Sequence, residues 1–456
     1  MDKNEDNKFV LLIASIASFL TSFMGSAVNV ALPSISIEFE IDAILLSWVA
    51  TSYLLSSAIF LVPFGRLADI YGRKRIFLYG ILIHTASSYL AAISTSPMIL
   101  IFFRIIQGIG VAMIFGTSMA ILTSIFTVGE RGKALGITIA AVYFGLSTGP
   151  FLGGFLTQNL GWRSIFLINV PLGLFVIILI FWKLKGEWAE AKGESFDIVG
   201  SIIFGLTLAA VMYGFSLLPE IKGTLLILIS GVGLYSFIKW EAYVKNPILN
   251  LNLFKNNILF TFSNLAALIN YSATFAVAFL LSLYLQYIKG LSPQNAGIIL
   301  ISQPIVQAIF SPLAGRLSDK IEPRLIASLG MSITVIGLIL LSFIAEKTSL
   351  TFIVMCLIIL GFSFALFSSP NANAIMSSVE KKFYGVASAI LGSMRLIGQM
   401  FSMGIAMIVF ALKIGRIQIT PEYFTHFLTS TKTTLVIFAI LCVLGTFASM
   451  GRGKIR

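Results

Sequence analysis

The sequence predicts an all-α polytopic membrane protein with two six-helix bundles and two additional helices between them. Three observations support this fold class. Of the 456 residues, 57% are hydrophobic and only 11% are charged, and the mean hydropathy is +0.97, so a soluble domain could not cover its surface. Long apolar runs fill the chain, and a short basic segment that follows the second run recurs after the tenth run.

A transmembrane helix needs about 20 mostly apolar residues, and fourteen runs in this chain satisfy that requirement. The run at 223–239 is the weakest, because it is short and contains Gly231 and Gly233. The first run is too long for the apolar part of a signal peptide, so we interpret it as a span. The expected limits are 9–32, 43–64, 76–94, 98–120, 135–157, 164–182, 198–217, 223–239, 257–286, 294–313, 325–344, 349–369, 384–411 and 433–450.

Lysine and arginine are distributed unequally between the two sides of the predicted membrane. With the N-terminus inside, 22 of them lie in inside loops and tails, seven lie in outside loops, and Arg104 and Arg395 fall within spans. Because positive residues are retained in the cytoplasm, we expect both termini there and the protein in the cell membrane. The net charge of +12 is spread over short loops, which is typical of contact with anionic lipid headgroups and not of nucleic-acid binding.

The basic segment that follows the second span has a partial copy 250 residues later. This repeat aligns spans 1–6 with spans 9–14. We therefore expect an N-terminal six-span bundle at 1–183, a linker with spans 7 and 8 at 184–256 and a C-terminal six-span bundle at 257–456. Two bundles related by an axis along the membrane normal are the plan of a secondary transporter. The loops are short and no Walker-type phosphate-binding sequence occurs, so the energy must come from a gradient.

The first basic segment runs from Gly65 to Arg75, and its partial copy runs from Gly315 to Lys320. These two segments resemble the signature of the major facilitator superfamily. Asp69 can accept hydrogen bonds from a helix N-terminus or pair with an arginine, and such a contact would hold one side of a transporter shut in one state and release it in the other. The alternative is a basic loop that only fixes topology. Ile70 stands where the signature usually has a basic residue, and the second copy lacks the basic ending, so we expect gating mainly at the first copy. The expected gating residues are Gly65, Asp69, Gly72, Arg73, Lys74 and Arg75 in the first copy and Gly315 and Asp319 in the second.

A glycine-rich segment in the fifth span resembles the motif that separates exporters from importers in this superfamily. Small residues four positions apart let helices pack closely, and a proline inside a helix removes a backbone hydrogen bond. The resemblance implies that transport is outward. The motif residues are Gly145, Gly149, Pro150, Gly153 and Gly154.

Further matches cover most of the chain and resemble the fourteen-span drug:proton antiporter branch, which implies multidrug efflux. That branch often carries an acidic residue in the first span, where this chain has Met24 and Ser26. The matching segments begin at Val28, Ser47, Gly161, Phe196, Tyr284 and Gly385.

Two arginines fall within the predicted spans, and no carboxylate does. Arg104 and Gln107 resemble a second family signature, which links this arginine to proton transfer; the alternative is a cation that pins two helices through backbone carbonyls. Arg395 falls about 16 Å along its span, near the midplane where substrates of these folds bind. Because a buried cation needs a counter-charge, we expect anionic or neutral amphipathic substrates in preference to permanent cations.

Proton coupling would then use groups at the ends of the spans, such as Asp69 or Glu38, or else His84 in the third span. Histidine is the side chain that ordinarily titrates near neutral pH. The alternative for His84 is a purely structural role.

These observations favour a gradient-driven exporter of amphipathic organic compounds that exchanges them for protons and works as a monomer. The alternatives are an exporter of one endogenous anionic or lipid-like metabolite and a non-transporting receptor or scaffold. A membrane enzyme is disfavoured, because no buried nucleophile–base pair appears. We expect no cofactor and no metal, since His84 and His426 are the only histidines. The expected partners are a small amphipathic substrate, protons and the lipid bilayer, and not nucleic acid.

Overall fold

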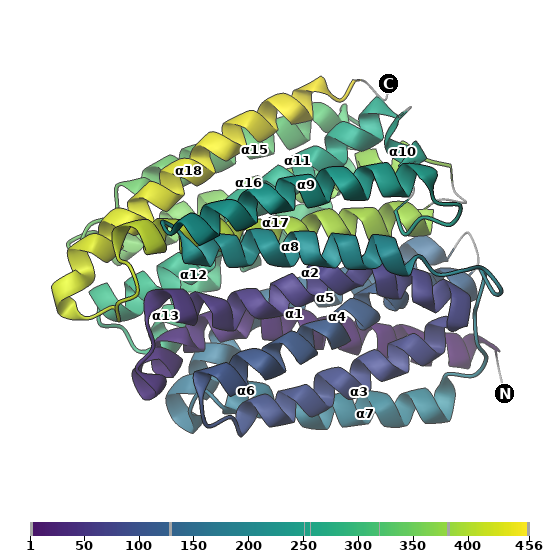
Figure 1. Cartoon of the computed structure of the whole chain (residues 1–456), viewed down its shortest axis with the longest axis horizontal. Coiled ribbons are helices and arrows are strands. Elements are labelled where there is room, and N and C mark those ends of the chain that lie inside the picture. Colours follow the sequence, from purple (N-terminus) through teal and green to yellow (C-terminus); the bar gives the residue numbers. More distant parts are fainter. Residues whose placement is uncertain are drawn as a thin grey trace.

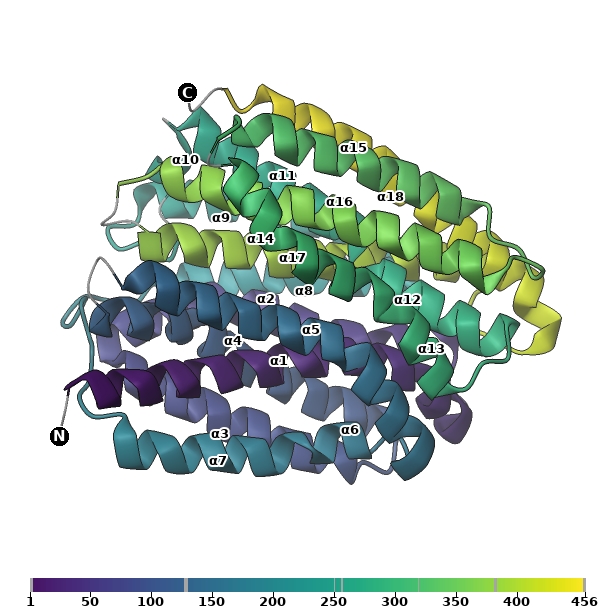
Figure 2. The same ribbon diagram turned by 180° about the vertical axis from the view of Figure 1, so that it is seen from behind.

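The computed structural model of the chain describes residues 3–126, 130–249, 251–255, 257–318, 320–380 and 384–453, and these residues form helices without β-strands. Figure 1 shows the long helices lying side by side, with both chain termini at the same end of the molecule. We call this end the terminal end and the other the opposite end. The view from behind shows the same arrangement (Figure 2). The all-α polytopic fold class is therefore confirmed.

Seven helices form the first half of the chain, and they end before a segment without regular structure at 184–197. Two long antiparallel helices and one short helix follow, and the remaining helices form the second half. The first set is α1 (Lys3–Phe39), α2 (Ala43–Tyr71), α3 (Arg73–Ala92), α4 (Pro97–Ile125), α5 (Arg131–Leu160), α6 (Ser164–Leu167) and α7 (Asn169–Lys183). The middle set is α8 (Ile198–Leu217), α9 (Ile221–Tyr243) and α10 (Asn252–Lys255). The last set is α11 (Ile258–Thr274), α12 (Ala276–Leu283), a π-helical turn (Tyr284–Ile288), α13 (Pro293–Leu300), α14 (Ser302–Ser318), α15 (Pro323–Ser342), α16 (Leu350–Ser377), α17 (Tyr384–Lys413), a 3-10 turn (Pro421–Tyr423) and α18 (Phe424–Gly451).

In the described part of the chain, thirteen helical segments are long and apolar enough to cross a membrane. α3 is not among them, because its first turn is basic and polar residues such as His84 and Ser88 interrupt its apolar sequence. α3 nevertheless packs against α4 and α7. The ninth and tenth expected spans are each divided, at Phe275 and Ile301, into shorter helices.

The helices extend beyond the apolar runs at several ends, so some carboxylates that lie outside the expected spans belong to the helices. Glu38 belongs to α1, Asp69 to α2 and Glu241 to α9. The predicted limits followed hydropathy, whereas helical hydrogen bonding continues through the polar headgroup regions on either side of the hydrocarbon core. All three acids lie near helix ends and none lies at mid-helix.

The two halves repeat one pattern of neighbouring helices. In the first half α1 packs on α5, α2 on α4, and α3 on α4 and α7. In the second half α11 packs on α17, α14 on α16, and α15 on α16 and α18. The repeat of the sequence therefore corresponds to a repeat of the packing. α8 and α9 pair with each other, and α8 also contacts α2 and α17.

The halves meet along α2 and α17 and, towards the opposite end, along α5 and α13. There Ser282 Oγ of α12 donates to the carbonyl of Asn29 in α1 at 2.7 Å, and Gln286 Nε2 donates to the carbonyl of Val30 at 2.9 Å. The structure thus holds the halves together at the opposite end.

Candidate functional site

The first basic segment, which we expected to form a loop, is almost entirely helical. α2 continues through Asp69 to Tyr71, Gly72 interrupts the helix with φ of 120°, and α3 begins at Arg73. Only glycine adopts this φ readily. The single-residue connection brings Arg73 to Asp69, where Arg73 Nε donates to Asp69 Oδ1 at 2.8 Å. This is the aspartate–arginine contact that the sequence suggested.

The segment 184–197 lies against this basic turn and supplies further partners, in addition to Ser124 of α4, whose Oγ accepts from Arg73 Nη1 at 2.6 Å. Arg73 pairs with Glu190 at 2.7 Å, and Arg66 pairs with Glu194 at 2.5 Å. Two backbone hydrogen bonds add to them, from Arg73 N to Trp188 O and from Ala191 N to Asp69 O, each at 2.9 Å. The basic segment is therefore bound by the chain that follows α7 and not only by its own aspartate.

Gly72 is needed here for a second reason. Glu187 Oε1 accepts a hydrogen bond from Lys74 N at 2.8 Å, and a Cβ atom added at residue 72 would lie 2.4 Å from Glu187 Cδ. Arg75, which is exposed, comes within 4.0 Å of the same carboxylate. Sequence reasoning missed Glu187, Glu190 and Glu194, although three acids close after the sixth span, on the predicted side of the basic segment, were a signal for this pairing.

The second basic segment is described only in part. Gly315 lies in the last turn of α14 and faces Ser369 of α16 at ordinary contact distance. Asp319, the other expected residue of this copy, lies outside the described residues. Gly65 of the first copy occupies the corresponding place against Gly116 of α4.

The glycine motif of the fifth span packs α5 against two different helices. Three of its glycines allow α5 to approach α1: a Cβ atom would lie 2.6 Å from Phe19 O at Gly145, 2.6 Å from Ser26 Cβ at Gly149 and 2.9 Å from Ala27 Cα at Gly153. Gly154 faces the other half of the protein, where the same atom would lie 2.4 Å from Pro293 O. In the reciprocal contact, Pro150 O would lie 2.2 Å from a Cβ atom added at Gly297 of α13. The motif therefore serves both the packing of one half and the contact between halves.

Arg104 is enclosed by α2, α3 and α4, with only 1% of its surface exposed. Its Nε donates to Val49 O at 3.0 Å and its Nη1 to Gln107 Oε1 at 2.7 Å. Gln107 Nε2 in turn donates to Ser88 Oγ at 2.7 Å, and the guanidinium carbon lies 4.1 Å from the centre of the Tyr53 ring. The bond to Val49 joins α4 to α2, and the bond from Gln107 to Ser88 joins α4 to α3. This geometry is that of a cation that holds neighbouring helices together.

His84 lies beside this network, where α3 crosses α4. It is buried, and neither ring nitrogen has a hydrogen-bond partner. The close crossing is possible because residue 110 is glycine, where a Cβ atom would lie 2.8 Å from His84 N.

Arg395 has a different environment, between the halves. Its guanidinium carbon lies 5.2 Å from the centre of the Phe115 ring of α4, and its Nε is buried without a hydrogen-bond partner. Tyr143 of α5 and Arg395 are close enough to interact electrostatically with Tyr271 of α11, and the Tyr271 ring contacts Phe364 of α16. Arg395 thus lies against an aromatic ring of the first half and within electrostatic reach of Tyr271, where helices of both halves converge.

A further arginine, Arg452, pins the second half at the terminal end and was not singled out in the sequence. It follows α18 and is 1% exposed. Its Nη1 donates to Asn371 Oδ1 at 2.7 Å and its Nη2 to Pro323 O at 3.1 Å. Burial lowers the pKa of Arg452 to about 10, so it is charged at neutral pH.

At the opposite end, Glu38 holds the connection between α5 and α6. Its carboxylate pairs with Arg163 at 2.6 Å and accepts a hydrogen bond from Trp162 Nε1 at 2.7 Å.

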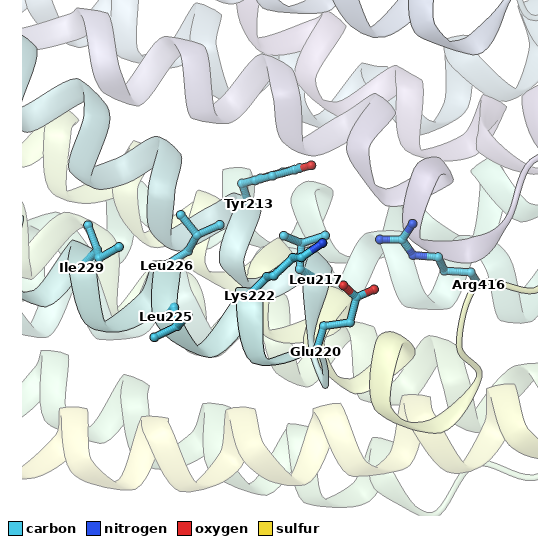
Figure 3. A pocket seen from close by; sticks show the side chains of 8 residues that line it. All are labelled: Tyr213, Leu217, Glu220, Lys222, Leu225, Leu226, Ile229 and Arg416. Carbon is cyan, nitrogen blue, oxygen red and sulfur yellow. The ribbon is translucent and has the colours of Figure 1, made fainter.

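An open pocket of about 500 Å³ lies where α8 turns into α9, beside the segment that follows α17. The charged groups of Glu220, Lys222 and Arg416 converge at one end of it, and its walls are apolar (Figure 3). None of the expected site residues lines it. The lining residues are Tyr213, Leu217, Glu220, Lys222, Leu225, Leu226, Ile229 and Arg416.

Comparisons with known proteins agree with the repeated architecture. The family model of the Major Facilitator Superfamily matches residues 14–266 and again residues 264–452. The riboflavin transporter RibZ of Clostridioides difficile (strain 630) is 31% identical over 441 residues, which cover 96% of this chain and 95% of that protein. The multidrug transporter protein MdtP of Bacillus subtilis (strain 168) is 30% identical over 421 residues, which cover 89% and 76%. A solved crystal structure also matches, that of a bacterial homolog of the human lysosomal transporter Spinster in an inward-facing, unoccupied conformation. It superposes with a TM-score of 0.71 over 98% of this chain and 97% of the other. The sequence identity is 16%, so the match shows the shared fold.

Proposed function

This chain belongs to the major facilitator superfamily, and we propose that it exports amphipathic organic compounds in exchange for protons by alternating access. Its relatives are named as transporters, so the chain is a membrane transporter and not an enzyme. Several relatives at about 30% identity are named for multidrug resistance or transport, which supports a broad amphipathic substrate range.

The observation that carries the substrate proposal is the position of Arg395. Its guanidinium lies between the halves, with the Phe115 ring beside it and a buried nitrogen that no group of the described residues binds. The ring faces of Phe115 and Phe364 suit the apolar part of a ligand, whereas the cation and the hydroxyl groups of Tyr143 and Tyr271 suit an anionic or hydrogen-bonding part. An anionic or neutral amphipathic compound fits this environment better than a permanent cation, which would meet an uncompensated positive charge.

The basic turn supports the proposed gating. Asp69, Arg73 and Glu190 form a charged cluster at the terminal end, while the contacts of Ser282, Gln286 and Gly154 close the opposite end. We assign the terminal end to the cytoplasm, because the inside loops hold most of the lysines and arginines. On that assignment the structure corresponds to a state closed to the exterior, and export requires the seam at the opposite end to open.

The organisation proposed for this cycle is the one expected from the repeat: bundles at 1–183 and 257–456 move against each other, and the segment 184–256 connects them. We propose that one polypeptide completes the cycle in the cell membrane, because both repeats needed for alternating access occur in a single chain.

A second candidate is the export of one endogenous anionic or lipid-like metabolite. The buried Arg104 and the half-buried Arg395 favour it, since neither pairs with a carboxylate among the described residues, as does the similarity to a relative named as a riboflavin transporter. The two candidates differ in breadth of substrates and not in the transport mechanism.

Reconstituted protein tests both. Proteoliposomes with an imposed pH gradient are supplied with a panel of anionic, neutral and quaternary ammonium dyes of similar size. We expect gradient-dependent transport of the anionic and neutral dyes, and its loss in Arg395→Gln with partial retention in Arg395→Lys. Transport of one anionic compound alone selects the second candidate, and efficient transport of the quaternary ammonium dye contradicts the role of Arg395.

A further inference from the structure

Two acidic side chains are buried in the described part of the chain, and both belong to the α8–α9 pair. Asp197 is 6% exposed and Glu241 is 3% exposed. Asp197 caps the first turn of α8, and Glu241 lies in the last turn of α9. Because these two helices run antiparallel, both acids are brought together at the terminal end.

The hydrogen bonds of the two acids are incomplete. Asp197 Oδ1 accepts from Gly200 N at 2.9 Å, and both of its oxygens lie 3.0 Å from Trp240 Nε1. Glu241 Oε2 accepts from Leu249 N at 2.8 Å. Glu241 Oε1 is buried and has no hydrogen-bond partner. A buried carboxylate oxygen without a donor is costly.

The unpartnered oxygen faces the other acid. A Cβ atom added at Gly200 would lie 2.2 Å from Asp197 Oδ2 and 2.6 Å from Glu241 Oε1. Both oxygens therefore border the same small space, which is free only because residue 200 is glycine. Two carboxyl groups that share a buried site do not both ionise at low cost and retain one proton between them.

Among the residues that the structure describes, no neighbouring cation compensates the pair. Asp197 is the charged group that acts on Glu241, and its other neighbours are the backbone N–H groups of Ile248 and Leu249. The nearest lysines along the chain, Lys192, Lys239 and Lys245, are exposed. Glu194, in the preceding segment, is engaged by Arg66. The N–H groups around the pair also disfavour a metal cation, which would need several oxygen ligands.

We propose that Asp197 and Glu241 form a proton-binding site, in which Glu241 Oε1 carries the proton and donates it to Asp197 Oδ2. The proton supplies the hydrogen bond that Glu241 lacks and removes the repulsion between the two carboxylates. Its release leaves two negative charges in the buried space and weakens the association of the start of α8 with the end of α9.

The site is connected to the basic turn through one short segment. Asp197 is the last residue of 184–197, the segment whose Glu187, Glu190 and Glu194 bind that turn. The same region is tied to the chain that follows α9 by Asn246, whose side-chain oxygen accepts a hydrogen bond from Ser195 Oγ at 3.1 Å and whose side-chain nitrogen donates to Glu194 Oε2 at 3.2 Å. Proton release at the pair therefore loosens the anchor of the segment that holds Arg66 and Arg73. The proton site itself does not depend on the proposed function, but this link to gating does.

The first test measures the protonated carboxyl directly in the purified full-length protein. We expect an infrared C=O band of a protonated carboxylic acid at neutral pH that disappears in Glu241→Gln. The matched control is Glu220→Gln, which removes an exposed acid at the other end of the same helix pair; it should leave the band unchanged. Absence of the band in the wild type, or its persistence in Glu241→Gln, overturns the proposal.

The second test follows thermal stability between about pH 5 and pH 9. The wild type should lose stability as the pH rises, because proton release creates the repulsion, and Glu241→Gln should be flatter and melt a few degrees higher at the alkaline end. Glu220→Gln should parallel the wild type. Sodium chloride could stabilise the wild type more than choline chloride does, and Glu241→Gln could abolish that difference. This result would identify a sodium site and contradict the proposed proton-binding site. If Glu241→Gln does not fold, Asp197→Asn and the wild-type infrared spectrum decide the question.

Transport distinguishes the site from its link to gating. If the band and the stability profile behave as expected, Glu241→Gln should also flatten the pH dependence of transport in proteoliposomes. An unchanged pH dependence would refute the link to gating while the proton site stands, and absence of any transport by the wild type would count against the proposed function alone.

Discussion

Gly154→Ala should destabilise the conformation in which the halves are closed at the opposite end. The added Cβ atom would lie 2.4 Å from Pro293 O and 3.0 Å from the Pro293 carbonyl carbon. Both belong to the backbone of the other half, so the contact cannot be relieved by a change of rotamer. Overpacking of this kind costs typically about 1–3 kcal/mol, and a value of about 2 kcal/mol changes a two-state population ratio roughly thirty-fold. The clash disappears when the halves separate, so the population shifts towards the state that is open at this end.

Gly136→Ala is the matched control for this substitution. Gly136 lies in the same helix, and a Cβ atom there would meet nothing within 4 Å. Replacing glycine by alanine stabilises a helix by up to about 1 kcal/mol in either conformation, and the control accounts for that effect. Gly149→Ala is a second comparison, because its clash with Ser26 lies within one half and should lower stability in every conformation.

The assay is labelling of a cysteine at Ser282 by a membrane-impermeant maleimide. Ser282 is buried in the seam, where its hydroxyl donates to Asn29 O, and the native Cys356 and Cys442 are both buried. Labelling of Ser282→Cys should be markedly faster in the Gly154→Ala background than in the Gly136→Ala background, and the transport rate should fall. Equal labelling rates in the two backgrounds would refute the reasoning that Gly154 is a state-specific contact between the halves.

Three further predictions follow from the charged residues. Arg104→Gln should lower the thermal stability of the purified protein strongly, since it removes charge-assisted hydrogen bonds worth roughly 1.5–3 kcal/mol each. Arg395→Gln should instead abolish transport with little loss of stability. The reverse pattern would contradict the assignment of Arg104 to packing and of Arg395 to substrate binding. Arg73→Ala should impair transport and stability more than Glu190→Gln, because the Arg73 side chain is 8% exposed and that of Glu190 is 68% exposed. An ion pair with so exposed a partner contributes less than about 1 kcal/mol to stability. Equal effects of the two variants would show that the Arg73–Glu190 pair contributes more than an exposed ion pair does. His84→Gln should leave the pH dependence of transport unchanged, since both ring nitrogens are buried without partners, and a shifted pH profile would show that His84 carries the proton.

The spans and their duplication could be predicted because they depend on local sequence. Apolar runs of about 20 residues form helices in a membrane irrespective of their partners, and the basic segment marks the same position in each half. The prediction was less accurate at helix ends. Glu241 was expected in a loop after residue 239, whereas α9 continues to Tyr243, because the hydrogen bonding of a helix does not stop where its hydropathy falls.

The roles of individual charges depended on tertiary contacts. The sequence by itself determined the membrane fold, the repeat and the position of the basic segment that contains Asp69, since these follow from composition and from spacing along one stretch of chain. Only the tertiary structure decided that Glu190, 117 residues away from Arg73, is its partner, that Arg104 is enclosed within one half while Arg395 lies between the halves, and that Asp197 faces Glu241. The reason is physical: hydrophobicity selects which segments enter the membrane, but the pairing of buried polar groups is decided by which helix ends meet once those segments pack.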